Sequence, residues 1–499
     1  MDKRKSLLNI SVSVSFKILS VACVILTRKV LINTCGNETV GLNALYLSII
    51  GILSLAELGV GTAITFCMYK PIVEENHDQV SALYHLFRKL YAVIGIIVLA
   101  VGLLLIPFLP YLAKDYARLD IDLYGSFLLM LVSVVLTYFF GAKTALINAY
   151  KNNYITNAIY SCGMIFEYFL QIAVLLVTKS FSWYLACKIL SVLLQWGATS
   201  LYATKHYDRI IVNRQKVNKE SKTVVVRSIR AMFMHKVGSL MATSVDSLII
   251  SVFVGVIALG EFSNYTTILY SLDTILALIF RSLTSVVGHV YVSQSKEMTR
   301  KYGELFHMLN FIVGAVFFLG YYAIIDNLIA LLFAEELVIS RSVSVVITLN
   351  GFVHFMRYSV SLFRDASGAF YNDRWVPLIE GLVNLVLSVI LVRKMGVAGV
   401  IIATIVTNLL LCHVVEPYVV YHNSFEASPA KHYVKNYTMI ALFAGLLVCM
   451  DKLMISNSSQ WVELFTNGCI SVLLSLSCCA LVVAFDKDTR AFARKVLKE

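Results

Sequence analysis

The sequence predicts an all-α, polytopic membrane protein of about 14 transmembrane helices, and three observations lead to this fold class. Hydrophobic residues make up 59% of the 499 positions and charged residues only 14%, whereas an ordinary soluble domain carries about 25% charged residues. The apolar residues gather into runs of about 20, the length that a helix needs to cross a bilayer core of about 30 Å. Because the runs are continuous and do not alternate with polar positions, they favour helices over the strands of a membrane barrel.

Fourteen apolar runs follow one another along the chain, as two groups of six and a final pair. The first six are 8–32, 43–67, 90–112, 124–146, 155–177 and 181–203. After a basic stretch come 231–257, 262–290, 305–333, 343–363, 375–392 and 397–419. The final pair is 437–453 and 462–485. An even number of crossings places both chain ends on the same side of the membrane.

The distribution of Lys and Arg residues indicates on which side of the membrane the two chain ends lie. If the N-terminus is cytoplasmic, 26 of the 42 Lys and Arg residues fall on the cytoplasmic side, nine fall on the opposite side, and seven lie within the runs. This bias predicts both termini in the cytoplasm, because positive residues concentrate in cytoplasmic connections. It also accounts for the net charge of +12 without a nucleic-acid partner. The basic stretch 204–230 is interpreted as a linker that contacts anionic lipid head groups.

An internal repeat relates the two groups of six. Residues 30–46 match residues 249–265 at a constant offset of 219. The matched residues are Gly36 with Gly255, Gly41 with Gly260, and Tyr46 with Tyr265. Because six spans separate the copies, both enter the membrane from the same side, which predicts parallel halves around a central cavity. The predicted organisation is an N-terminal six-helix half (1–203), a basic cytoplasmic linker (204–230), a C-terminal six-helix half (231–421), and two last helices with a basic cytoplasmic tail (422–499).

Motifs of catalytic sites are absent from the sequence. It contains no GxxxxGK[ST] phosphate-binding loop, no HExxH zinc motif and no GxSxG nucleophile motif. The ten cysteines lie in or beside apolar runs without metal-ligand spacing, so neither a metal nor another cofactor is expected. A membrane ligase or glycosyltransferase usually has a sizeable extramembrane loop, and none is long enough here. We therefore expect a transporter rather than an enzyme, with no catalytic residues.

Basic residues inside the apolar runs are the candidate substrate contacts. Each charge in the bilayer costs about 2.5 to 3.5 kcal/mol, so it must face a partner, water or a substrate. Arg364 is expected to extend to the membrane interface, which long basic side chains near helix ends can reach. The candidate substrate-binding residues are Arg28, Lys236, Arg281 and Arg357. The alternative for each is a structural ion pair, for example Lys236 with Asp246 or Arg281 with Asp273.

Three of the acidic residues inside the runs are candidate sites for a coupling ion. They are Glu57, Asp246 and Asp273, since a partly buried carboxylate can exchange a proton near neutral pH. Glu57 lies beside Gly59 and Gly61, where small residues permit close helix contact or a local break of the helix. Its alternative role is a hydrogen bond between packed helices.

Several short segments carry a family resemblance. One is SLAELGVGTAI at 54–64, continuing to YKP at 69–71. The others are RDASGAFYNDR at 364–374, PLIEG at 377–381, NLVLS at 384–388 and GVAG at 396–399. Together with the pattern of six, six and two spans, they resemble the Wzx-type bacterial polysaccharide flippases of the multidrug/oligosaccharidyl-lipid/polysaccharide superfamily. The resemblance covers essentially the whole chain.

The resemblance implies a flippase that moves an undecaprenyl-pyrophosphate-linked oligosaccharide from the cytoplasmic to the outer leaflet of the bacterial plasma (inner) membrane, for surface polysaccharide biosynthesis. Its implied partners are this lipid-linked oligosaccharide, membrane lipids, and polysaccharide polymerase or assembly proteins. We expect alternating access through a cation-lined cavity, which suits an anionic, hydrated head group. Coupling to H⁺ or Na⁺ stays open. Two other functions also stay open: a cation-coupled multidrug antiporter of the same superfamily, and a membrane glycan ligase or polymerase.

Overall fold

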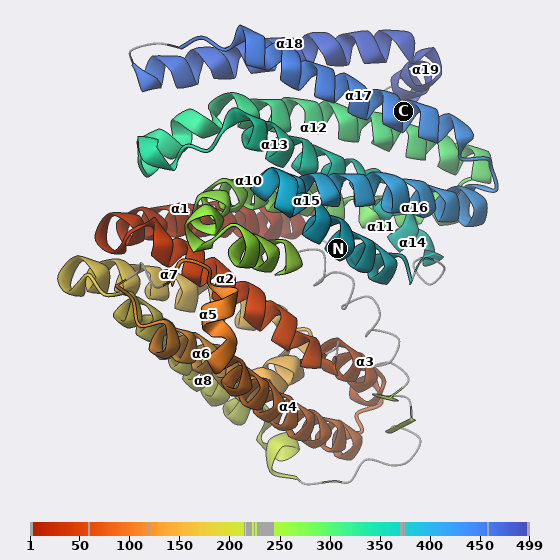
Figure 1. Ribbon diagram of the computed structural model, residues 1–499. Helices are drawn as coiled ribbons and strands as arrows, with labels where there is room; N and C mark the ends of the chain where they lie inside the picture. The colour runs from red at the N-terminus through yellow and green to blue at the C-terminus, as the bar shows by residue number, and fades with distance from the viewer. Residues whose placement is uncertain are drawn as a thin grey trace. The chain divides into compact units, whose positions relative to one another are not determined.

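Helices form every regular element that the computed structural model describes (Figure 1). The described residues are 3–57, 60–116, 120–213, 215, 222–223, 225–226, 244–369, 373, 375–456 and 459–496. The chain divides into two compact units, Met1–Gly260 and Glu261–Glu499. The boundary between them lies inside helix α10 (Val256–Ser282). Most of the basic linker and the start of the seventh predicted span fall outside the described residues. The division into two six-helix halves and a final pair therefore stays a prediction.

The helices of the first unit follow the predicted runs, and polar side chains set where two of them begin. The bounds are α1 (Lys3–Cys35), α2 (Asn37–Leu53), α3 (Val60–Val73), α4 (His77–Leu105), α5 (Leu109–Leu112), α6 (Leu123–Ala149), α7 (Asn153–Thr178), α8 (Phe181–Val212) and a further helix Ser244–Phe253. Asp122 caps α6 by accepting a hydrogen bond from the Gly125 N–H at 2.9 Å. Asn76 caps α4 in the same way, through the Gln79 N–H at 3.0 Å. Such caps satisfy amide groups that the first helical turn leaves without a partner.

The second unit contains the last nine labelled helices and most of α10. Their bounds are α11 (Thr284–Ser293), α12 (Lys296–Leu332), α13 (Arg341–Met356), α14 (Tyr358–Ser367), α15 (Val376–Thr407), α16 (His413–Val420), α17 (Ala430–Leu453), α18 (Gln460–Phe485) and α19 (Lys487–Val496). Two π-helical segments, Asn408–Cys412 and Tyr421–Phe425, flank α16. The chain therefore stays helical from α15 to residue 425, although two of its segments are wound as π-helix.

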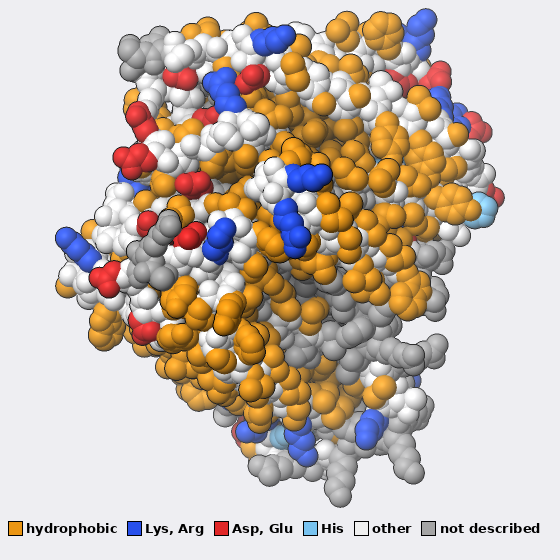
Figure 2. Space-filling view, in the orientation of Figure 1, with side chains coloured by type: hydrophobic (Ala, Val, Ile, Leu, Met, Phe, Trp, Pro, Cys, Tyr) orange, Lys and Arg blue, Asp and Glu red, His pale blue; other side chains and the backbone are white. Residues whose placement is uncertain are grey.

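Eight helices in the described part of the chain are long and apolar enough to cross a membrane. Three lie before residue 260 and five after it. In α7 only 11% of the most apolar window is buried inside the protein, and in α18 only 17%, so most of their side chains face outward. Figure 2 shows hydrophobic side chains over much of the visible surface. The chain is a multi-pass membrane protein of the predicted all-helical class.

Several predicted spans are interrupted rather than continuous. The run 43–67 is not one continuous α-helix: it contains a 3₁₀ turn at Ser54–Glu57, and α3 begins at Val60. The run 343–363 is divided at Arg357 into α13 and α14. The opposite occurs in α15, where the two predicted runs 375–392 and 397–419 are joined into one helical element across Gly396. The φ of Gly396 is +56°, in the left-handed region that favours glycine.

Aromatic rings fill the interior of the second unit between α12, α13 and α17. Phe352 on α13 stacks on Phe443 on α17, with 3.7 Å between the ring centroids. Gly314 allows α12 to approach this layer, because a Cβ atom at this position would lie 2.9 Å from the Phe355 ring. Buried aromatic packing of this kind contributes strongly to stability. It fixes α13, and therefore the position of Arg357 at the end of α13.

The repeated residues occupy matching places in the backbone. Gly36 precedes α2 with φ +86°, and Gly255 precedes α10 with φ +140°, so both glycines turn the chain into a new helix. Tyr46 on α2 donates a hydrogen bond to the Leu123 carbonyl oxygen at 2.9 Å, at the start of α6. The Tyr265 hydroxyl accepts one from the Ile339 N–H at 3.3 Å, just before the start of α13. Each tyrosine thus holds the beginning of a helix more than 70 residues further along the chain.

The N-terminal ends of α2 and α10 pack against each other through the same repeat. A Cβ atom at Gly41 would lie 2.0 Å from the carbonyl oxygen of Val256. Reciprocally, a Cβ atom at Gly260 would lie 2.6 Å from the carbonyl oxygen of Asn37. Asn37 and Val256 are themselves separated by the repeat offset of 219. The contact is therefore exchanged pairwise between repeated positions.

Candidate functional site

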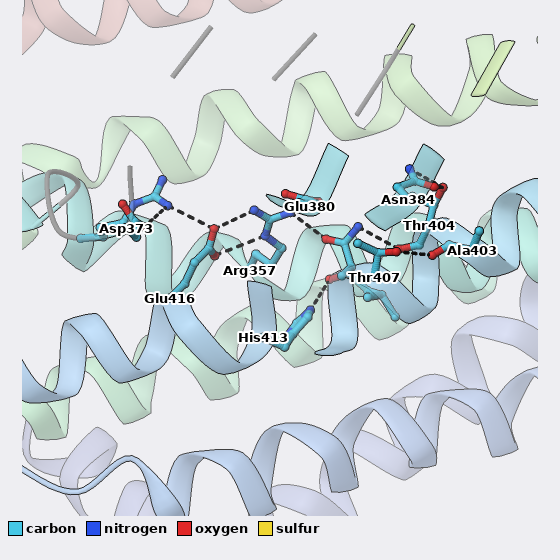
Figure 3. Close-up of polar contacts among 12 residues, drawn as sticks. Arg357, Asp373, Glu380, Asn384, Ala403, Thr404, Thr407, His413 and Glu416 are labelled. Atoms are coloured by element: carbon cyan, nitrogen blue, oxygen red, sulfur yellow. Dashed lines mark hydrogen bonds and ion pairs between the residues drawn. The ribbon is translucent and has the colours of Figure 1, made fainter. Parts of the chain in front are cut away.

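Arg357, one of the predicted substrate contacts, lies at the centre of a buried ion-pair network in the second unit (Figure 3). Its Nη2 atom donates to Glu416 Oε1 at 2.6 Å, and its Nε atom donates to Glu416 Oε2 at 3.3 Å. Its Nη1 atom donates to Asn408 Oδ1 at 2.7 Å and to Glu380 Oε1 at 3.4 Å. The two-pronged contact with Glu416 matches the planar fork of the guanidinium group to the carboxylate.

Arg364 extends this network along α14. Its Nη1 atom donates to Asp373 Oδ2 at 2.9 Å and to Glu416 Oε1 at 3.1 Å. The sequence predicts a side chain that extends to the membrane interface, but only 21% of the Arg364 side chain is exposed. The Glu416 and Asp373 side chains are each 3% exposed. The two arginines therefore share three buried carboxylates, counting Glu380, and the network contains its own counter-charges.

Local backbone structure brings these side chains together. In a regular α-helix, residues eight positions apart differ by roughly 80° around the axis. Asn408 and Glu416 have this spacing, yet both reach Arg357. The π-helical segment that begins at Asn408 supplies a wider turn between them, which reduces the angle. Such single π-helical turns occur frequently at functional sites.

Histidine and tyrosine side chains surround the network. The His413 Nε2 atom lies 3.0 Å from the Val353 carbonyl oxygen. His413 Nδ1 lies 3.0 Å from Asn436 Nδ2, which links α16 to α17. Tyr358, the residue after Arg357, donates to Asp273 Oδ2 at 2.8 Å. These contacts join the surroundings of the network to α10, α13 and α17 of the second unit.

The predicted substrate-binding residues lie in different parts of the chain, and the structure describes the side-chain contacts of only some of them. Arg28 is half-buried on α1, in the first unit. Lys236 lies outside the described residues. Arg281 lies near the end of α10, and its side chain is also outside the described part of the chain. Arg357 is the one of the four whose contacts are described in full, and its nearest groups are carboxylates and an amide.

The three predicted ion-coupling residues lie on separate elements. Glu57 ends the 3₁₀ turn, and its Oε1 atom accepts a hydrogen bond from the Tyr91 hydroxyl at 2.5 Å. This hydrogen bond joins the 3₁₀ turn to α4, and a hydrogen bond between packed helices is the alternative role given above for Glu57. Asp246 is half-buried on the helix Ser244–Phe253. Asp273 Oδ1 is buried and accepts no hydrogen bond from the described residues.

Glu416 and Asp373 were not predicted from the sequence as partners of the two arginines. Glu416 lies inside the apolar run 397–419 and directly precedes Pro417. A carboxylate in such a run needs a partner, and that signal could have paired it with a base of the same half. Asp373 lies between two predicted spans, so its burial could not be anticipated from hydropathy.

The fold is found in solved structures of transporters. A lipid II flippase, MurJ, in an inward closed conformation matches with a TM-score of 0.63 and 16% identity, over 96% of this chain and 99% of that chain. A multidrug resistance transporter of the MATE family, from the MOP superfamily, matches in an inward-facing conformation with a TM-score of 0.57 and 14% identity, over 84% of this chain and 94% of that chain. No family model and no curated protein matches the sequence. The chain therefore shares its fold with these two transporters.

Proposed function

We propose that this protein is a flippase that moves an undecaprenyl-pyrophosphate-linked oligosaccharide from the cytoplasmic to the outer leaflet of a bacterial plasma membrane. The observation that carries the proposal is the match to a lipid flippase over 96% of this chain, compared with 84% for the multidrug transporter. The Wzx-type segments quoted above support the same substrate class. A pyrophosphate with a hydrated glycan cannot enter hydrocarbon cheaply, so it needs a polar path while its lipid tail stays in the bilayer.

The proposed path uses basic residues other than Arg357. Arg28, Lys236 and Arg281 are kept as substrate contacts, because a guanidinium or ammonium group forms strong hydrogen bonds with phosphate oxygens. Arg357 is already bonded to Glu416, Glu380 and Asn408, so we assign it to holding α13 and α14 against α15 and α16. Substrate binding at Arg357 would first have to break these contacts.

The mechanism proposed is alternating access of the two predicted halves, with both termini in the cytoplasm. Glu57, Asp246 and Asp273 are the proposed sites for a coupling H⁺ or Na⁺. Polysaccharide polymerase or assembly proteins would take up the glycan on the outer side. No step of this cycle requires a catalytic residue or a cofactor.

A cation-coupled multidrug antiporter is the second candidate, and one observation favours it. The buried network contains three carboxylates, Glu416, Glu380 and Asp373, against two guanidinium groups. An excess of negative charge suits a cationic substrate better than an anionic one. The fold is common to both kinds of transporter.

Reconstituted liposomes separate the two candidates. Purified protein is placed in liposomes that contain either a labelled undecaprenyl-pyrophosphate oligosaccharide or an encapsulated cationic dye. We expect movement of the lipid-linked oligosaccharide between leaflets and no movement of the dye. Movement of the dye alone would eliminate the flippase and support the antiporter.

The same assay tests the proposed substrate contacts. Arg28→Ala and Arg281→Ala are each expected to lower the initial rate of oligosaccharide movement at least about tenfold, as expected from loss of a charge-assisted phosphate contact worth about 1.5 to 3 kcal/mol. Lys394→Ala is the control, because Lys394 is an exposed basic residue within α15 that is not among the predicted substrate contacts. Wild-type rates in both arginine variants would remove the assignment.

A further inference from the structure

The last helix, α19, is a short amphipathic helix with a basic face. Thr489 is buried and Phe492 is half-buried, so one face packs against the protein. On the other face Lys487, Arg494 and Lys495 are exposed, with Arg490 half-buried beside them. This division of polar and apolar residues is typical of helices that lie in the plane of a membrane interface.

Contacts with α12 and α17 fix α19 in place. The Phe492 ring meets the Tyr302 ring of α12 edge to face, with 5.0 Å between the centroids. Lys431 on α17 pairs with Asp488 at 3.2 Å, and Lys435 pairs with Asp486. Burial tends to raise the pKa of Asp486, but hydrogen bonding and charge attraction from Lys435 outweigh it and hold this pKa below its ordinary value. The basic face of α19 is therefore presented in a defined orientation.

The basic residues on the helices that contact α19 differ in their ion-pair partners from the basic residues on α19 itself. On α12, Arg300 pairs with Glu304 at 2.9 Å and Lys301 pairs with Glu297 at 2.8 Å. Lys431 and Lys435, in the first turns of α17, pair with Asp488 and Asp486, as described above. By contrast, the structure gives none of the four bases on α19 an ion pair with a described residue. Figure 2 shows Lys, Arg, Asp and Glu side chains gathered at the upper right, where Figure 1 places α19.

The position of α19 along the chain indicates what covers this face. It follows α18 after a single residue, and α18 is largely lipid-facing up to its last residue, Phe485, whose exposed fraction is 84%. A helix that begins where a lipid-facing span ends lies at the level of the lipid head groups. Clusters of basic residues on an amphipathic helix at this level attract anionic head groups.

We propose that the bases of α19, the exposed Lys487, Arg494 and Lys495 with the half-buried Arg490 beside them, form a binding surface for anionic phospholipid. The bound head groups neutralise charges that no described residue neutralises. Because α19 is joined to α12 and α17 by the contacts above, the lipid holds the ends of these two helices together. This surface is separate from the proposed substrate path, and its test does not depend on the transported substrate.

The test counts lipids bound to the full-length protein. The purified chain in neutral detergent is titrated with phosphatidylglycerol or with phosphatidylcholine, and bound lipid is measured by native mass spectrometry. The test variant is Lys487→Gln/Arg494→Gln/Lys495→Gln. The control variant is Lys179→Gln/Lys394→Gln/Lys452→Gln, which removes the same charge from three exposed lysines on three separate segments of the chain. Thermal unfolding in phosphatidylcholine checks that both variants are folded.

The wild-type protein and the control are expected to prefer phosphatidylglycerol. The test variant is expected to lose this preference by on the order of a hundredfold, from about 1 kcal/mol for each base near the head groups. The preference of the wild-type protein should also weaken between about 50 mM and about 500 mM salt. Unchanged binding in the test variant, or equal loss in the control, would overturn the proposal. Binding of polyglutamate but not of phosphatidylglycerol would assign the face to an acidic protein and overturn it as well.

Discussion

Glu416→Gln is expected to lower the free energy of unfolding by about 3 to 5 kcal/mol, because it removes one partner of a buried ion pair and leaves the other charge uncompensated. Glu416 accepts hydrogen bonds from both Arg357 and Arg364, and its side chain is 3% exposed. Neither arginine can turn to water without breaking its remaining contacts with Glu380, Asn408 or Asp373. Thermal unfolding of the purified protein in detergent measures the loss as a lower midpoint temperature.

Asp365→Asn is the matched control for this prediction. Asp365 also pairs with Arg364, at 3.4 Å, but its side chain is 57% exposed. An exposed pair contributes at most about 1 kcal/mol, so this variant should unfold close to the wild-type temperature. If Glu416→Gln shifts the midpoint no more than Asp365→Asn does, the network is not the stabilising element described here.

Replacement of either repeated glycine, Gly41 or Gly260, with alanine should separate the N-terminal ends of α2 and α10. A Cβ atom would lie 2.0 Å from a backbone oxygen at Gly41 and 2.6 Å from one at Gly260, and a backbone atom cannot rotate away. Overpacking of a tight contact costs about 1 to 3 kcal/mol, and the shorter distance predicts the larger loss at Gly41. Thermal unfolding and initial transport rates are the measurements, and both should fall for Gly41→Ala and Gly260→Ala.

Gly288→Ala and Gly445→Ala are the controls for the repeat. Both glycines lie within helices, and an added Cβ atom would meet nothing within 4 Å. Alanine in an open helical position is neutral or stabilises by about 0.5 to 1 kcal/mol. Equal behaviour of all four variants would show that the close contact between repeated positions has no energetic weight.

The sequence predicted the helices well because hydropathy reports how long an apolar segment is. The run 124–146 corresponds to α6 at Leu123–Ala149, and the run 462–485 to α18 at Gln460–Phe485. Interruptions were harder to predict, because they depend on partners distant in the sequence. Arg357 divides α13 from α14 while it bonds to residues of two later helical segments, and no local pattern indicates this.

The candidate site could be predicted in part. Charged residues in apolar runs are rare and costly, so Arg357 was identified from the sequence alone. Its pairing with Glu416 could not be derived, since it depends on the π-helical turn at Asn408 that brings Glu416 to the same side. Hydropathy identifies which charges need a partner, whereas the fold decides whether that partner is a carboxylate or a substrate.

Depletion of the protein in its native cells gives the most direct test of the proposed function. Lipid extracts from depleted cells are analysed by mass spectrometry, and intact spheroplasts are treated with a glycosidase that cannot cross the membrane. We predict that an undecaprenyl-pyrophosphate-linked oligosaccharide accumulates and is protected from the enzyme, because it stays in the cytoplasmic leaflet. Absence of such an intermediate, or its accumulation in a form that the glycosidase cleaves, would contradict the account.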